Sequence, residues 1–388
     1  MNLPLRHVDN RQVDHENHPL LYFGGCDYLR LSHHPRVMDA AKTSIDREAS
    51  LSSSASRTTT GNHAVYESLE KALAHFIGVE SARLTGAGYL ANLVLADYLK
   101  QTASLIMLDA HAHPSLRDTV RLSGRPSCTF RHQDAENALA TFHRQGSPPQ
   151  CFLLSDAVFG IDGSTMPVDD FHTLLPTGIS FLLDDAHGLG YGGPAGRGTG
   201  TGLDLGSRQI IRTLSLAKVL GCHGGAVAGN AQVLEHVTKK SPSWSGHTPF
   251  PMNTAVAAST SLSLLQQDHS ARHALDQNMD RMREIMGNLH GMQTETLDFP
   301  VVTFCFDASR HQHHGKRLAE VLTSHGIYPS LIQYPATGSE LLLRIAIASA
   351  HLPEDMQRLE AALKALQDWS GLKRFRLKNQ SIQLPSDG

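Results

Sequence analysis

The sequence lacks any apolar run that approaches the roughly 18 residues needed to span a membrane. It also lacks an excess of either charge, because 34 basic and 37 acidic residues leave a formal net charge of −3, which gives no attraction to nucleic acid or to an anionic membrane. The five cysteines are scattered without C-x-x-C spacing, which predicts a reducing cytoplasm. The first residues contain no long apolar stretch, so no signal peptide is expected.

Histidine, by contrast, is abundant at 24 residues, and three of them gather at His311, His313 and His314. No cysteine or carboxylate completes a metal-ligand set there, so the sequence predicts a solvated helix start and no metal site. The basic stretch 373–378 is likewise expected to be a solvated end of the chain.

Strand-like and helix-like segments alternate from Ser81 onward. Short apolar runs predict strands near 81–85, 104–109, 127–131, 150–155, 179–184, 209–214 and 225–229. Helical patterns lie between several of them, for example at 89–100 and 115–122. This order is typical of an α/β fold with a mostly parallel central sheet and helices on both faces, which binds ligands outside the carboxyl ends of its strands.

The length of 388 residues predicts more than one domain. We expect residues 1–48 to form an N-terminal arm and helix, of which the polar first 20 residues are loose. Residues 49–285 are expected to form a large domain around the sheet, and residues 286–388 a smaller α/β domain.

An acid and a lysine follow two of the predicted strands. Asp184 ends the strand 179–184, and Lys218 lies just beyond the strand 209–214. Pyridoxal 5′-phosphate (PLP) needs this pair, because a lysine forms its Schiff base and a carboxylate binds its pyridine nitrogen. Each residue alone is also explained as a surface lysine or a helix-capping aspartate. The spacing of the two together favours the cofactor.

A seat for the cofactor phosphate is predicted at a second strand end. Gly88 and Tyr89 follow the strand 81–85 and begin a helix, where small residues and free backbone N–H groups suit an anion. Ser215, three residues before Lys218, is expected to reach the same phosphate.

Two histidines are candidates for the cofactor ring. His113 follows the strand 104–109 and is expected to lie on the pyridine ring and to exchange a proton, with His111 as the alternative. His187, three residues after Asp184, is expected to reach the phenolic oxygen of the ring.

Arg344 is the one charged residue of the apolar stretch 341–347. A charge in such a strand is costly unless it is paired, and guanidinium binds carboxylate in a two-point fork. A substrate carboxylate is therefore the predicted partner, and an internal salt bridge is the alternative. The glycine-rich run 192–198 raises a different possibility, a nucleotide-binding module, but it lacks the strand–turn–helix order of such a motif.

Taken together, these motifs resemble the α-oxoamine synthases, which are fold-type I PLP enzymes, over about residues 26–366. The matching segments are Cys26–Leu29 for N-D-Y-L, Ala87–Asn92 for S-G-Y-x-A-N, Asp109–Ser115 for D-x-x-x-H-x-S, Asp184–Gly188 for D-E-A-H-G, Ser215–Gly221 for T-L-S-K-A-L-G, and Arg344 for R-L-R-I. The pattern is most similar to that of the 8-amino-7-oxononanoate synthases of biotin biosynthesis.

The resemblance implies a decarboxylative condensation of a small amino acid with an acyl-CoA, which yields an α-aminoketone, CoA and carbon dioxide. It assigns catalysis to Lys218, His113, Asp184 and His187. It also implies a cytoplasmic homodimer with its sites at the subunit interface. The alternatives are a related synthase that uses a fatty acyl-CoA and a PLP-dependent aminotransferase.

The chain departs from the family pattern at positions expected to bind substrate together with Arg344. Cys26 stands for the usual asparagine, Tyr66 for a histidine and Gly160 for a serine. The segment 246–251 also differs from the usual S-T-x-x-P-P. We expect Gly160 to admit a bulkier group and Tyr66 to favour an apolar acyl chain.

Overall fold

A computed structural model describes residues 4–201, 208–289, 297–305, 314–332, 341–370 and 373–374. The chain divides into two compact units. One, which we call the large unit, contains residues 34–159 and 165–267. The other, the small unit, contains residues up to 33, residues 160–164 and residues 268–376. Residues 34–48, which we expected in an N-terminal segment, are thus grouped with the large sheet.

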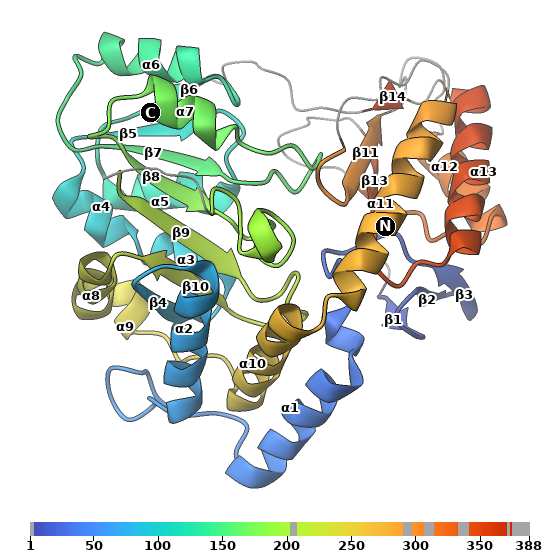
Figure 1. Ribbon diagram of the computed structural model, residues 1–388, viewed down its shortest axis with the longest axis horizontal. Coiled ribbons are helices and arrows are strands. Elements are labelled where there is room, and N and C mark those ends of the chain that lie inside the picture. The colour runs from blue at the N-terminus through green and yellow to red at the C-terminus, as the bar shows by residue number, and fades with distance from the viewer. Residues whose placement is uncertain are drawn as a thin grey trace. The chain divides into compact units, whose positions relative to one another are not determined.

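The large unit is built on a seven-stranded sheet in the order β4-β10-β9-β8-β7-β5-β6 (Figure 1). Its strands are β4 (Ser81–Thr85), β5 (Leu105–Asp109), β6 (Ser127–Phe130), β7 (Cys151–Asp156), β8 (Ser180–Asp184), β9 (Ile210–Ser215) and β10 (Gly225–Gly229). All neighbours from β9 to β6 are parallel, and β10 is antiparallel to both β4 and β9. The mostly parallel sheet predicted from the sequence is confirmed.

Helices cover both faces of this sheet, as predicted (Figure 1). Alternate residues of each strand enter different cores: Phe152 and Leu154 pack on one side of β7, and Leu153 on the other. The first face is covered by α3 (Gly88–Leu93), α4 (Ala96–Thr102), α5 (Pro114–Ser123) and α8 (Ala231–Lys240). The second is covered by α6 (Ala135–Arg144) and α7 (Val168–Leu174). By this alternation, Asp156 and Asp184 point to the face of α3 and α5.

The remaining helices of the large unit are α1 (Pro35–Glu48), α2 (Ala64–Ile77), α9 (Pro242–Ser245) and α10 (Met252–Gln267). α1 begins with proline at its first position, and the side chain of His34 accepts a hydrogen bond from the N–H of Arg36. α2 ends at Gly78, whose φ of +81° lies in the left-handed region and whose N–H donates to the carbonyl of Ala74. Glycine adopts this conformation without a steric penalty, which is why the helix ends here.

The small unit contains an antiparallel sheet in the order β12-β13-β11-β14. Its strands are β11 (Val301–Cys305), β12 (Leu331–Ile332), β13 (Leu342–Ala346) and β14 (Lys373–Arg374), and its helices are α11 (Ser270–Asn288), α12 (His314–Ser324) and α13 (Pro353–Ser370). His311 and His313 of the expected histidine cluster lie outside the described residues. Residues 375–378 of the basic stretch 373–378 also lie outside them. Across the described ranges, no helix has the length and apolar character needed to cross a bilayer.

Residues 4–20, the described part of the first 20, do not form the loose arm that their polar composition predicts. They form a three-stranded antiparallel sheet of β1 (Arg6–His7), β2 (Gln12–His15) and β3 (His18–Leu21). Glu16 and Asn17 connect β2 to β3 with φ values of +52° and +65°, the conformation of a tight two-residue hairpin turn. Val13 and Leu20 face each other in register and are buried.

Backbone hydrogen bonds tie this N-terminal segment to residues 326–349 of the same unit. The N–H of Leu21 donates to the carbonyl of Gly326 at 2.8 Å, and its own carbonyl accepts from Tyr328 at 2.8 Å. The carbonyl of Phe23 accepts from Ala346, the last residue of β13, at 2.9 Å. The N-terminal segment and residues 326–349 therefore belong to one compact unit.

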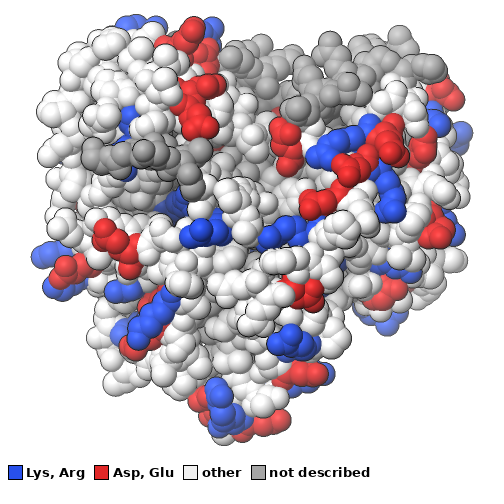
Figure 2. Space-filling view, in the orientation of Figure 1, with Lys and Arg blue, Asp and Glu red and all other residues white. Residues whose placement is uncertain are grey.

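Positive and negative side chains are interspersed over the face of the molecule in view (Figure 2). This mixture matches the small net charge of the sequence, −3. It offers no broad basic surface on this face of the kind that binds a nucleic-acid backbone.

A buried histidine gives the small unit a defined dependence on pH. Nδ1 of His351 accepts the N–H of Ala348 at 3.1 Å, so its Nε2–H donates to the carbonyl of Tyr22 at 3.2 Å. The first of these bonds needs the neutral ring, because a protonated Nδ1 cannot accept a hydrogen bond. Burial lowers the pKa of His351 to about 3, and the nearby Arg30 acts in the same direction. Unfolding therefore takes up a proton between about pH 6.5 and pH 3, and stability falls as the pH falls through this window.

We predict that His351→Gln reduces the loss of unfolding free energy between pH 7 and pH 5 by about 2 kcal/mol relative to the unaltered chain, because 1.5 pH units below the ordinary pKa correspond to that amount. Urea unfolding at the two pH values measures it, with the exposed His18→Gln as the control. An equal pH dependence in both variants would contradict the assignment.

Candidate active site

The site begins at Asp184, the last residue of β8. Oδ2 of its carboxylate accepts a hydrogen bond from Nδ2 of Asn92 at 2.6 Å, and Oδ1 accepts from the N–H of Ala186 at 3.1 Å. The side chain is buried. A carboxylate in such a place needs donors, and these two supply them.

Asn92, on α3, links Asp184 to the next strand and to the next loop. Its amide oxygen accepts from the hydroxyl of Thr213 at 2.7 Å, and Nδ2 also donates to Oγ of Ser115 at 2.8 Å. Oγ of Ser115 in turn lies 2.7 Å from Nδ1 of His113. Because Nδ1 also accepts the backbone N–H of Ser115 at 3.3 Å, it carries no proton, and the neutral ring of His113 carries its proton on Nε2.

Burial lowers the pKa of His113, and the Lys218 ammonium lowers it further, while Asp184 opposes both. The three predicted residues are therefore close enough to act on one another. His113 is a neutral imidazole at pH 7 that presents an Nε2–H donor. The structure thus brings together the lysine, the acid and the histidine that the sequence predicted.

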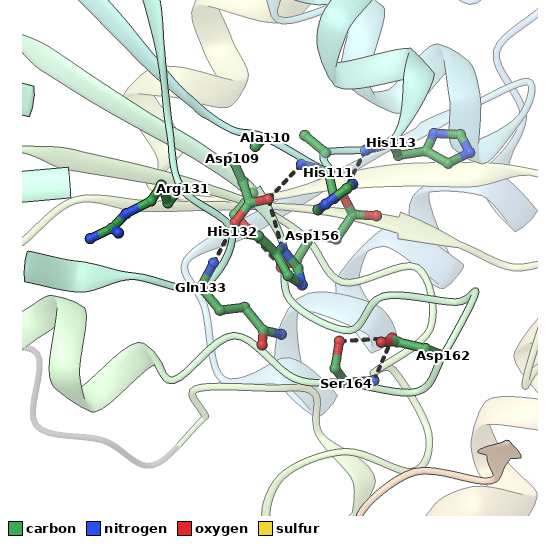
Figure 3. Close-up of polar contacts among 12 residues, drawn as sticks. Asp109, Ala110, His111, His113, Arg131, His132, Gln133, Asp156, Asp162 and Ser164 are labelled. Carbon is green, nitrogen blue, oxygen red and sulfur yellow. Dashed lines mark hydrogen bonds and ion pairs between the residues drawn. The ribbon is translucent and has the colours of Figure 1, made fainter. Parts of the chain in front are cut away.

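A second carboxyl, Asp156, lies beside Asp184 on the neighbouring strand β7. Its Oδ2 accepts the backbone N–H of His113 at 2.7 Å (Figure 3). Burial raises the pKa of Asp156 well above its usual range, and the charge on Asp184 adds to this effect. Asp156 therefore fixes the loop of His113, and its surroundings favour the protonated form of its carboxyl over the charged form.

Asp109, at the end of β5, fastens the same loop from its other side (Figure 3). Its carboxylate accepts the N–H of His111 at 2.8 Å, Nδ1 of His132 at 2.9 Å and the N–H of Gln133 at 3.0 Å. The loops after β5 and β6 are thus joined through one carboxylate. The backbone N–H of His111, the alternative partner of the cofactor ring, is one of these three donors to Asp109.

The turn that precedes α3 forms a cradle in which side chains do not fit. A Cβ on Gly88 would lie 2.9 Å from Cβ of Ser215, and a Cβ on Gly225 would lie 2.4 Å from the carbonyl oxygen of Ala87. Backbone and hydroxyl groups therefore meet closely where the phosphate seat was predicted. The acid, the lysine and this cradle fit PLP: a partner for the pyridine nitrogen, an amine for the aldehyde carbon and small polar groups for the phosphate.

Two further predicted residues lie at this edge. The ring of Tyr89 meets that of His113 edge-on at 5.9 Å between centroids, and its hydroxyl donates to Asp118 of α5. His187 is half-buried in the turn after β8. Among the described residues, no group of three or more histidine, cysteine or acidic side chains is arranged to hold a metal ion.

Three of the predicted substrate residues come together in the small unit. Nε of Arg344 donates to the carbonyl of Gly160 at 2.8 Å, and Nη1 donates to the carbonyl of Gly25 at 3.0 Å. Nη2 lies 3.7 Å from Sγ of Cys26 and 3.5 Å from the hydroxyl of Tyr28. None of these four partners is a carboxylate. The contacts of Arg344 with the described residues therefore do not include the internal salt bridge that was the alternative.

Tyr66, the fourth, is fully buried in the large unit. Its hydroxyl donates to the carbonyl of Phe250 at 2.7 Å, and the guanidinium of Arg57 lies over its ring at 5.4 Å. The structure therefore accounts for Tyr66 through protein contacts. Its contact with an acyl chain stays a prediction.

The glycine run 192–198 encloses a buried carboxylate. A Cβ on Gly198 would lie 2.2 Å from Oδ2 of Asp185, and one on Gly188 would lie 1.9 Å from Oδ1. The N–H of Thr199 donates to the same carboxylate at 3.0 Å. The run is thereby explained by the packing around Asp185 and not by a nucleotide.

Sequence reasoning gave no role to Asn92, Ser115 or Asp156. Asp156 carried the same signal as Asp184, a carboxylate at the end of an apolar strand. Asn92 and Ser115 belong to the segments Ala87–Asn92 and Asp109–Ser115, which match the family pattern. No local feature of the sequence showed that the side chain of Asn92 contacts both Ser115 and Asp184.

Comparison with known proteins identifies the family of this chain. The model of the aminotransferase class I and II family matches residues 19–363. An 8-amino-7-oxononanoate synthase of Acidithiobacillus ferrooxidans is 31% identical over 89% of this chain and 88% of its own. The 8-amino-7-oxononanoate synthase 2 of Bacillus subtilis is 30% identical over 91% and 89%.

Solved structures share the fold. A serine palmitoyltransferase from S. paucimobilis with bound PLP and myriocin superposes with a TM-score of 0.85, at 22% identity over 94% of this chain and 92% of that one. An 8-amino-7-oxononanoate synthase from Francisella tularensis superposes with a TM-score of 0.74, at 22% identity over 90% and 98%. The predicted fold type is confirmed.

We predict that Asn92→Ala lowers the free energy of unfolding by about 1–3 kcal/mol, because it removes one buried hydrogen-bond partner from each of Asp184, Thr213 and Ser115. Asn137→Ala, which removes only a surface bond to the N–H of Arg131, is the matched control. Denaturant unfolding of the two variants compares them, and equal losses would show that the Asn92 network contributes no special stability.

Proposed function

The chain belongs to the aminotransferase class I and II family and is a PLP-dependent enzyme of the α-oxoamine synthase type, and from this premise we propose that it condenses a small amino acid with an acyl-CoA. The products are an α-aminoketone, CoA and carbon dioxide. One observation carries the proposal: His113 lies within electrostatic reach of both Lys218 and an Asp184 carboxylate that Asn92 holds in place. Condensation at the α-carbon of an amino acid needs this acid, because it keeps a pyridine nitrogen protonated.

When bound, PLP supplies an electron sink for the α-carbon of the amino acid. We assign Nζ of Lys218 to covalent attachment and to removal of the α-proton. Asp184 holds the proton of the ring nitrogen, and Asn92 fixes its carboxylate. His113 offers its Nε2–H to oxygen atoms at the reacting centre, since its Nδ1 is taken by Ser115.

We assign Gly88, Tyr89 and Ser215 to the phosphate and His187 to the phenolic oxygen. The Gly88–Ser215 contact supports the phosphate assignment, because a larger residue at position 88 would fill this space.

We assign Arg344 to the carboxylate of the substrate. Its known partners are two carbonyls, a thiol and a phenol, so a carboxylate would meet a guanidinium whose charge these partners do not neutralise. Cys26 and Gly160 touch the same guanidinium. The departures from the family pattern at these two positions therefore bear on which amino acid is accepted, and they leave the cofactor residues unaltered.

The decisive experiment combines cofactor trapping with a product assay. We predict that the purified protein takes up PLP and turns yellow, and that borohydride fixes the cofactor on Lys218, as peptide mass spectrometry would show. With small amino acids and acyl-CoAs of increasing length, free CoA and carbon dioxide should appear in equal amounts.

A protein that binds no added PLP would overturn the cofactor assignment. Conversion of the amino acid to a keto acid without release of CoA would instead identify an aminotransferase. A strong preference for fatty acyl-CoA would place the activity with the serine palmitoyltransferase-like synthases.

We predict that Arg344→Ala raises KM for the amino acid by roughly 10- to 100-fold, the equivalent of losing charge-assisted hydrogen bonds of about 1.5–3 kcal/mol. KM for the acyl-CoA should change little. Arg317→Ala, which removes an exposed arginine paired with Glu320 on α12, is the control. A change confined to KM for the acyl-CoA would assign Arg344 to the other substrate.

We also propose that the enzyme acts as a homodimer in the cytoplasm, as the family resemblance implies. All five cysteines are free thiols, which suits a reducing compartment. Sedimentation of the purified protein tests the dimer.

A further inference from the structure

Two places where the chain departs from the family pattern touch each other. Tyr66 stands where a histidine is usual, and Phe250 lies in the altered segment 246–251. Besides the hydrogen bond from the Tyr66 hydroxyl to the Phe250 carbonyl, the two rings meet edge-on with centroids 5.9 Å apart. Tyr66 is 0% exposed and Phe250 4%. Because the two residues are 184 positions apart in the chain, this contact is tertiary and specific.

Tyr66 is held rigidly on its other side. Arg57 lies over the ring of Tyr66 and over that of Trp244, and its guanidinium forms a buried ion pair with Glu70. Glu70 also accepts the N–H of Leu84, in β4, at 2.9 Å. Tyr66 is therefore fixed to the central sheet, and its hydroxyl is a firm anchor for the segment that contains Phe250.

Phe250 packs against Gly224, in the turn between β9 and β10. A Cβ on Gly224 would lie 2.6 Å from the ring of Phe250, and Gly224 has a φ of +117°, so only glycine fits there. The carbonyl of Gly224 accepts the N–H of Leu216 at 3.0 Å, and the carbonyl of Leu216 accepts the N–H of Cys222 at 3.0 Å. These bonds close the turn 216–224 between β9 and β10, and this turn carries Lys218.

We propose that Tyr66 and Phe250 are positioning residues that hold the turn 216–224, and with it Lys218, against the end of the sheet. The inference rests on the proposed function, in which Lys218 is the reacting amine. Reacting groups must be held to a fraction of an ångström, and a displacement of about 1 Å can lower the rate by roughly 100-fold. The two departures then act as one coupled change in the support of the lysine, separate from the choice of substrate.

Hydrogen–deuterium exchange on the full-length protein tests this coupling, first loaded with PLP and again after the cofactor is removed. Tyr66→Phe deletes one hydroxyl, and Phe250→Leu removes the ring that lies on Gly224. Each should speed exchange at the amides of Leu216 and Cys222 by roughly three- to tenfold, the effect of one lost net hydrogen bond. Tyr98→Phe, which deletes the hydroxyl bonded to Gln209 elsewhere in the large unit, is the matched control and should leave the turn unchanged.

The double variant distinguishes a shared route from two separate ones. If Tyr66 acts through Phe250, adding Tyr66→Phe to Phe250→Leu speeds exchange no further. In the loaded protein, the pH midpoint of the visible absorption band should also shift in Tyr66→Phe and stay fixed in Tyr98→Phe.

Unchanged exchange in the turn in both single variants, or strictly additive effects in the double variant, would overturn the proposal. If Tyr66→Phe does not fold, Phe250→Leu alone still decides the question. Unchanged exchange at Leu216 and Cys222 in that variant would overturn the proposal. Failure of the protein to bind PLP would refute the proposed function yet leave the exchange result on the cofactor-free protein readable.

Discussion

The buried carboxylate of Asp184 is the constraint on which the large unit depends. It sits at the end of β8 on the face that alternation along the strand assigns to α3. A charge in this position is tolerated only with donors close by, and Asn92 reaches it because α3 packs on that same face. Strand register, helix placement and the chemistry of the site are therefore one requirement. At Asp156, in register beside it, burial and the Asp184 charge raise the pKa and so disfavour a second charge.

The central sheet could be predicted because its strands are short apolar runs, buried on both faces, which stand out from polar connections. All seven were placed within one residue of their observed bounds. The helical pattern at 89–100 also predicted helix where α3 and α4 lie, but not the interruption between them, since no glycine or proline marks residues 94–95. The N-terminal sheet was missed for a related reason: β1 and β2 are rich in charged and polar residues, and the turn at Glu16–Asn17 contains no glycine.

Within the site, the sequence predicted where the functional residues lie in the fold, but it did not predict their hydrogen-bond partners. Strand ends placed Asp184 and Lys218 at one edge of the sheet, because parallel strands present their carboxyl ends together. The bond between Asn92 and Asp184 spans 92 residues, and that between His113 and Asp156 spans 43. No local pattern specifies which polar side chains meet over such distances. The tautomer of His113 follows from these hydrogen bonds, so it could not be predicted from the sequence either.

The departures from the family pattern show the same limit in a sharper form. Read one at a time, Cys26, Gly160 and Tyr66 looked like three changes in one substrate pocket. In the structure, Cys26 and Gly160 share the guanidinium of Arg344, whereas Tyr66 joins Phe250. The effect of a substitution depends on the residue it touches, so these three positions fall into two separate groups of contacts. Changes in substrate preference are then to be sought around Arg344, and changes in the behaviour of Lys218 around Tyr66, because each group of contacts can vary without disturbing the hydrogen bonds that hold Asp184.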